Sequence, residues 1–211
     1  MIIDIVKSNF KIIIFGFVFT FFSSIGQSFF IGLFNSNIRA ELNITHGEFG
    51  AIYGTATLCS SITLIWLGKK IDELKLVNYS ILVTLFLFIA ALFFSFVNGL
   101  IFLLVGIFFL RLSGQGLMDH TASTAVSRYF ERRRGKALSY IWLGMSLGEF
   151  LLPILVVYLL TFIYWRDLWI QTSIVILLVL PAFSYFAVRD IAISSREKDN
   201  EKNINKFITA K

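Results

Sequence analysis

Four ionisable side chains interrupt long apolar stretches of the sequence, namely Arg111, Asp119, His120 and Glu149. A charge in apolar surroundings is costly, and such residues commonly belong to a solute or ion path. The guanidinium of Arg111 can attract an anionic group, while the carboxyl of Asp119 or Glu149 can bind and release a proton. The chemistry indicated is therefore the binding of charged solutes or protons.

The spacing of these residues predicts which of them lie together. Arg111, Gln115 and Asp119 follow one another at i, i+4 and i+8, which places them along one slanting face of a helix. Counting about 1.5 Å per residue from the helix ends places Arg111 and Glu149 within about one turn of each other in depth. Two interpretations stay open: an ion pair that only neutralises both charges, or part of a substrate or proton path.

A second polar face is predicted near the N-terminus, where Thr20, Ser24, Gln27 and Ser28 share one side of a helix. These groups either bond to neighbouring helices or line a polar cavity. The amide of Gln27 on the same face as the hydroxyls favours the cavity. Ser24 and Gln27 are therefore added to Arg111, Gln115, Asp119 and Glu149 as candidates for the path.

Two glycine pairs with helical spacing predict close contacts between helices. Gly50-xxx-Gly54 and Gly144-xxx-Gly148 are small-xxx-small patterns, which let helix backbones approach each other. We expect these glycines to pack helices rather than bind a ligand.

Enzymatic chemistry finds no support. Ser113 and His120 share a helix face but lie about 10 Å apart along the axis, whereas a nucleophile and its base must come within about 3 Å. No phosphate-binding loop or metal cluster is present, and a single cysteine, Cys59, excludes an intrachain disulfide. We expect no enzyme activity, no cofactor and no metal.

The composition decides which elements position these residues. Of the 211 residues 57% are hydrophobic and only 15% are charged, against about 25% in a typical soluble domain. A soluble domain of this size cannot bury so much apolar surface. Water-soluble enzymes, disordered chains and nucleic-acid-binding modules are excluded, and a lipid bilayer is the expected surrounding.

Six apolar stretches reach the length of about 20 residues that a membrane helix needs. The sequence thus predicts an all-α polytopic membrane domain at 1–190. Its helices are expected at about 10–34, 48–68, 77–97, 100–127, 137–162 and 168–188. Residues 191–211 are charged and polar, and are expected to form a cytoplasmic tail or part of a linker.

Basic residues predict the orientation of the helices. Of the nineteen Lys and Arg residues, all but Arg39, Arg111 and Arg166 fall in the N-terminus, the tail and the two loops on the same side. Because basic loops stay in the cytoplasm, both termini are expected to be cytoplasmic, in a cell membrane. The net charge of +6 therefore reflects topology, and no nucleic-acid partner is expected.

Several segments resemble motifs of the major facilitator superfamily. The stretch Gly68-Lys69-Lys70-Ile71-Asp72-Glu73-Leu74-Lys75 resembles its G-x-x-x-D-[RK]-x-G-[RK] motif in Gly68, Asp72 and its basic residues, with Glu73 as a departure at the basic position. Arg111-Leu112-Ser113-Gly114-Gln115-Gly116 resembles its R-x-x-x-Q-G pattern. The basic loop at 128–137 and the pair Trp165-Arg166 are similar to family segments before the fifth and sixth helices. Glu149 replaces the proline of the family's antiporter motif, so antiport is not inferred.

The resemblance implies half of a secondary transporter, with six helices arranged as two inverted three-helix repeats. It implies alternating access for a small solute, anionic if Arg111 binds it, with symport of protons as one mode of coupling. Gly68, Lys69, Lys70 and Asp72 would form a cytoplasmic gating motif. A second six-helix half would come from another copy or a separate chain; a non-transporting subunit or scaffold, or an inactive fragment, is the alternative.

Overall fold

The computed structural model describes residues 10–130, 132–189 and 191. Within these residues every regular element is helical, which confirms the all-α fold class. The tail predicted at 191–211 lies outside the described residues except for Ile191.

Six helices in the described part of the chain are long and apolar enough to cross a membrane. The shortest has 20 residues, and at 1.5 Å per residue it spans about 30 Å, the thickness of a bilayer core. The predicted polytopic membrane fold is thus confirmed. The six segments are Phe10–Gly32, His46–Asp72, Leu76–Ser95, Leu100–Tyr129, Arg134–Leu159 and Trp165–Val188.

Two of these six segments are interrupted within their length, whereas the second ends in a 3-10 turn, Lys69–Asp72. The first consists of α2 (Phe10–Ser23), the 3-10 turn η1 (Ser24–Gly26) and α3 (Ser28–Gly32). The fourth consists of α7 (Leu100–Leu110), the π-helical segment η3 (Arg111–Met118) and α8 (Asp119–Tyr129). The first membrane segment, expected at about 10–34, is therefore interrupted at Gln27, where the backbone is extended.

The remaining helices have ends that the local sequence explains. A short helix, α4 (Asn35–Leu42), ends at Asn43, which adopts the left-handed conformation that asparagine tolerates. At the start of α5 (His46–Gly68) a capping box forms, with reciprocal bonds between Thr45 and Glu48. A 3-10 turn, η2 (Lys69–Asp72), follows α5, and the last helices are α6 (Leu76–Ser95), α9 (Arg134–Leu159) and α10 (Trp165–Val188).

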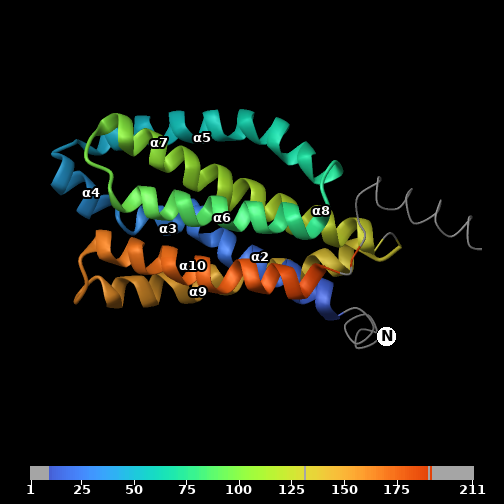
Figure 1. Ribbon diagram of the computed structural model, residues 1–211. Helices are drawn as coiled ribbons and strands as arrows, with labels where there is room; N and C mark the ends of the chain where they lie inside the picture. Colours follow the sequence, from blue (N-terminus) through green and yellow to red (C-terminus); the bar gives the residue numbers. More distant parts are fainter. Residues whose placement is uncertain (1–9, 131, 190, 192–211) are drawn as a thin grey trace, which may run out of the picture.

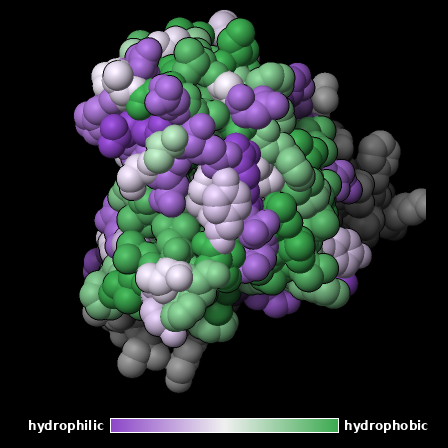
Figure 2. All heavy atoms as spheres, turned by 90° about the vertical axis from the view of Figure 1, so that its left-hand side faces the viewer, coloured by the Kyte–Doolittle hydropathy of each residue, from purple (hydrophilic) through white to green (hydrophobic). Residues whose placement is uncertain are grey.

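The six passes run side by side and alternate in direction (Figure 1). Because their number is even, Phe10 and Val188 lie at the same end of the bundle, called here the terminal end. The opposite end, which carries α4, is called the distal end. Figure 2 views the distal end and shows a band of hydrophilic side chains, with hydrophobic side chains beside it.

Most contacts among the six helices are preserved when the first three are exchanged with the last three, although α8 packs on α9 more extensively than the first helix packs on α5. The first helix packs on α9 as the fourth packs on α5, α6 packs on α10, and the first packs on the fourth. The first and fourth helices, the two with irregular backbone, thus occupy equivalent places. This pattern is the one expected of two inverted three-helix repeats.

Candidate functional site

The irregular segments of the first and fourth helices touch each other. A Cβ atom on Gly26 would lie 2.3 Å from the carbonyl oxygen of Leu110, and one on Gly114 would lie 2.7 Å from the Cα of Gly26. Neither position has room for a side chain, so the backbones of η1 and η3 meet directly. π-Helical segments often mark functional sites, and here one places Arg111 beside the break in the first helix.

Arg111 is buried, with 7% of its surface exposed, and it faces the break. Its Nη1 donates to the carbonyl oxygen of Gly26 and to Oγ of Ser28, both at 3.2 Å. Its Cζ lies 5.4 Å from the ring centroid of Tyr53, and the Tyr53 hydroxyl donates to Ser28 Oγ at 2.8 Å. Three membrane helices therefore supply the surroundings of this guanidinium.

The other edge of the Arg111 guanidinium has no partner. Within the described residues, Nε and Nη2 donate no hydrogen bond, Nε is fully buried, and no carboxylate forms an ion pair with the guanidinium. These two nitrogens form the edge that binds a carboxylate or phosphate through two parallel hydrogen bonds. This edge therefore has hydrogen-bonding capacity that no described residue uses.

Glu149 does not complete the site. Its side chain is exposed on α9, and no ion pair with Arg111 forms, so the pairing that the sequence left open is absent here. Depth along the helices predicted the two residues at a similar level, but the segments that carry them pack mainly on different neighbours. α9 packs mainly on α2, whereas η3 packs most on α5, although both also contact α2, α8 and η1.

Asp119 lies at the start of α8, also against the first helix. The Nε2 of Gln27 donates to its Oδ2 at 3.1 Å, while its Oδ1 is buried and has no hydrogen-bond partner. The carboxyl thus approaches the irregular backbone at Gln27 as Arg111 approaches it at Gly26. Gln115, between them in sequence, is half-buried and makes no side-chain hydrogen bond with the described residues.

The predicted polar face of the first helix is divided among three neighbours. Thr20 and Ser24 face α9, Gln27 reaches Asp119, and Ser28 reaches Arg111. The extended backbone of Gln27, with φ −81° and ψ 158°, changes the direction of the side chains that follow. Ser24 is fully buried against α9, so it does not line an open path in this conformation.

The two glycine pairs differ in their surroundings. A Cβ on Gly144 would lie 2.1 Å from the carbonyl oxygen of Phe17, and one on Gly148 would lie 2.2 Å from Ser24 Oγ, so both stand at the crossing of α9 and α2. Gly50 and Gly54 have no neighbouring atom within 4 Å of a Cβ. Their face of α5 has no partner within the described residues.

The predicted gating motif lies at the terminal end, beside the fourth helix. Asp72 forms an ion pair with Arg128 at 2.5 Å, and the Nε2 of His120 lies 3.1 Å from the carbonyl oxygen of Gly68. Lys70 pairs with Glu73 at 2.7 Å, and Lys69 is exposed. The motif residues therefore join the second helix to the fourth.

A polar cluster at the distal end joins α4 to the start of α10. The carboxylate of Glu41 accepts bonds from Arg166 at 2.7 Å and from Trp165 at 2.7 Å, and from the hydroxyl of Tyr164. Arg166 also donates to the carbonyl oxygen of Ser95 at 2.7 Å. Burial opposes ionisation of Glu41, but these hydrogen bonds and the charge of Arg166 outweigh it and lower the pKa of the carboxyl.

Sequence reasoning missed Tyr53, Arg128 and Glu41 as partners of the residues it selected. For Tyr53 a signal was present, since a phenol stands among small residues in the first half of a predicted membrane helix. Arg128 and Glu41 lie in loops or at helix ends, where spacing along one helix gives no information about contacts between helices.

Comparison with known proteins gives one family. The sequence matches the family model of the Major Facilitator Superfamily over residues 16–210, a range that includes Arg111, Asp119 and the η2 turn. No curated protein shows significant similarity to the chain.

Proposed function

The chain belongs to the major facilitator superfamily, whose members are membrane transporters rather than enzymes, and from that premise we propose that it carries a small anionic solute by alternating access. The observation that carries the proposal is the unpartnered Nε–Nη2 edge of the buried Arg111 guanidinium. A buried cation without a counter-ion is costly unless a ligand neutralises it. A carboxylate or phosphate of the solute supplies that charge and matches the geometry of the edge.

The surroundings of Arg111 support a transport role. Arg111 belongs to the fourth helix, and its guanidinium contacts Ser28 of the first helix and Tyr53 of the second. The first and fourth helices are both irregular beside it. In secondary transporters the substrate site commonly lies at such interruptions, near the midplane between repeats. Movement of any of the three helices changes the contacts of the anion, as alternating access requires.

Coupling to protons is assigned to Asp119. Its Oδ1 is buried without a hydrogen-bond partner, so it can accept a proton while Oδ2 keeps the bond from Gln27. Acidic groups at membrane depth act as proton relays in transporters. Symport of the anion with a proton would then neutralise both charged sites during one cycle.

The topology of the proposed transporter follows from the basic loops. The basic residues of the described loops after α5 and α8 lie at the terminal end, which supports a cytoplasmic location of both termini with the domain in the cell membrane. A second six-helix half, from another copy or a separate chain, is proposed to pack on the open Gly50–Gly54 face of α5.

The experiment tests the Arg111 edge directly. Purified protein is heated with a panel of small monocarboxylates, dicarboxylates and phosphate esters, each beside its neutral amide or alcohol analogue. A ligand that binds the folded state raises the melting temperature, so we expect anions, and not their neutral analogues, to stabilise the protein. Uptake of the stabilising anion into vesicles then measures transport.

Two variants decide the result. Arg111→Gln removes the charge and should lower the affinity for the anion at least tenfold, and Arg111→Lys should restore little of it because an ammonium lacks the planar edge. Lys136→Gln, on the exposed surface, is the matched control for loss of one positive charge. If Arg111→Gln bound the anion with wild-type affinity, Arg111 would not belong to the binding site. If only neutral solutes stabilised the protein, the proposal that the solute is anionic would be wrong.

A further inference from the structure

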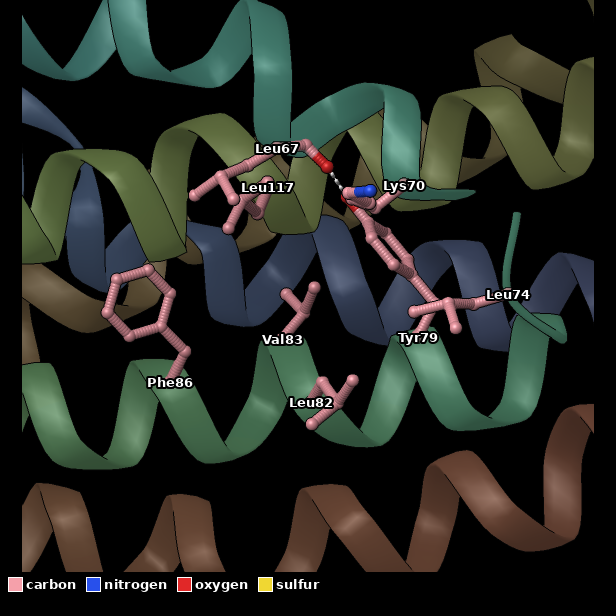
Figure 3. Close-up of a pocket in the computed structure, with 8 residues that line it drawn as sticks. All are labelled: Leu67, Lys70, Leu74, Tyr79, Leu82, Val83, Phe86 and Leu117. Atoms are coloured by element: carbon pink, nitrogen blue, oxygen red, sulfur yellow. Dashed lines mark hydrogen bonds between the residues drawn. The ribbon is translucent and has the colours of Figure 1, made fainter. Parts of the chain in front are cut away.

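An apolar groove lies between α5 and α6 near the terminal end, outside the Arg111 site (Figure 3). It has a volume of about 270 Å³, close to the lower end of the range for small-molecule sites of roughly 300–1,000 Å³. Its walls come from α5, η2, α6 and η3. The lining residues are Leu67, Lys70, Leu74, Tyr79, Leu82, Val83, Phe86 and Leu117.

The groove has an apolar wall and a polar end. The Tyr79 hydroxyl donates to the carbonyl oxygen of Leu67 at 3.1 Å, and Lys70 stands beside this bond in Figure 3. From Tyr79 the groove continues along α6 to Phe86, about 10 Å deeper at the rise of a helix. Val83 on its floor is 3% exposed, whereas Leu82 on its rim is 55% exposed.

This shape fits a lipid chain better than a water-soluble ligand. Six of its eight lining side chains are hydrocarbon, and Leu82 on its rim is exposed on a membrane helix, where lipid is the solvent. Hydrocarbon alone gives no preference among lipids, since the bilayer around the protein is equally apolar. A preference must therefore come from charge at the polar end.

The charges at that end favour an anionic head group. Lys70 is paired with Glu73, and Asp72 is paired with Arg128. Lys69 and Lys75 are exposed, and neither forms an ion pair with a described residue. Lys69 precedes the lining residue Lys70 in sequence and Lys75 follows the lining residue Leu74, so these two positive charges flank the turn that closes the polar end, between two membrane spans.

We propose that this groove, called here the Tyr79 groove, holds one acyl chain of an anionic phospholipid whose head-group phosphate contacts Lys69 and Lys75. The site stabilises the α5–η2–α6 turn, which carries Asp72, from the membrane side. It requires neither an anionic solute nor Asp119, so it stands apart from the transport proposal.

The test uses a fluorescent probe on the rim of the groove in the whole protein. Leu82→Trp places an indole there, and the matched control, Leu178→Trp, places one at an exposed position on α10. Each variant is reconstituted in phosphatidylcholine vesicles that contain increasing fractions of chain-brominated phosphatidylglycerol or chain-brominated phosphatidylcholine. Bromine quenches the added indole when its chain lies in contact with it, and wild-type fluorescence is subtracted.

At position 82 we expect half-quenching at a fraction of brominated phosphatidylglycerol at least about threefold lower than that of brominated phosphatidylcholine, because two lysines attract the head group. At position 178 the two lipids should quench equally. Adding Lys69→Gln and Lys75→Gln to Leu82→Trp should remove the preference. Adding Val83→Phe, which fills the groove, should remove it as well.

Three results would overturn the proposal. Equal quenching at position 82 would show that no anionic lipid is selected. The same preference at position 178 would show that the whole protein surface attracts anionic lipid. A preference that survives both lysine substitutions would show that Lys69 and Lys75 do not bind the head group. None of these measurements involves a solute, so they leave the assignment of Arg111 unaffected.

Discussion

Gly26 in the first membrane helix and Gly114 in the fourth meet backbone to backbone, with 2.7 Å between the Cα of Gly26 and the position of a Cβ on Gly114. This contact joins the two irregular segments of the bundle and places Arg111 and Asp119 against the opened backbone of the first helix. Both candidate groups of the site depend on it.

Alanine at this contact should therefore disrupt the site. Gly26→Ala places a methyl group 2.3 Å from the Leu110 carbonyl oxygen, a backbone atom that cannot rotate away. We expect a loss of about 1–3 kcal/mol in the free energy of unfolding and loss of transport. Gly32→Ala, which meets no atom within 4 Å, is the control, and equal melting temperatures for the two variants would contradict the contact.

Asp119→Asn should separate solute movement from the proton gradient. The amide keeps the shape of the side chain and a carbonyl oxygen for Gln27, but it cannot take up a proton at neutral pH. We expect uptake driven by an imposed pH gradient to fall at least tenfold, while exchange of labelled for unlabelled solute continues. Glu149→Gln should keep both activities, because Glu149 is exposed. If Glu149→Gln lost the uptake driven by the pH gradient and Asp119→Asn kept it, the proton-coupling residue would be Glu149 on α9.

Asp72 and Arg128, which form an ion pair, should be energetically coupled. Either single substitution, Asp72→Asn or Arg128→Gln, leaves one charge at the terminal end unpaired, and both together remove the pair. A double-mutant cycle on the free energy of unfolding, followed by thermal unfolding, should give a coupling energy of about 0.5 kcal/mol or more. The exposed pair of Lys70 and Glu73 is the comparison, with an expected coupling of about 0.3 kcal/mol. Additive effects at Asp72 and Arg128 would mean that the pair contributes nothing to the fold.

The Glu41 cluster should make the distal end sensitive to acid. Because the folded protein lowers the pKa of Glu41 below its usual 4.5, the carboxylate stabilises the fold above that pH. The contribution is lost as the pH falls through the lowered value. Melting temperatures between pH 7 and pH 3 should fall less steeply for Glu41→Gln than for the wild-type protein.

Arg166→Ala should be the more harmful change in the same cluster. It removes the partner of Glu41 and leaves the carbonyl oxygens of Ser95 and Val97 without their donor. We expect a loss of about 2–3 kcal/mol at neutral pH, since hydrogen bonds to charged groups are involved. Thermal unfolding followed by tryptophan fluorescence measures it, and a change no larger than that of Lys70→Ala would contradict the role of Arg166.

The sequence alone determined that this is an all-α membrane protein with six passes, because runs of about 20 apolar residues have no other stable arrangement in a chain of this length. It also selected Arg111 and Asp119, since a charge in such a run is costly and needs a reason. These conclusions depend on composition and on spacing along one helix, and neither requires knowing which helices pack against one another.

The tertiary structure decided which of the selected residues act together. The break at Gln27 and the π-helical η3 change the direction of side chains after them, so the predicted polar face of the first helix divides between α9, Asp119 and Arg111. Depth along the membrane suggested a pair of Arg111 with Glu149, but position around the bundle gave Arg111 the partners Ser28 and Tyr53 instead. Periodicity describes a single regular helix, and contacts between helices depend on where that regularity fails.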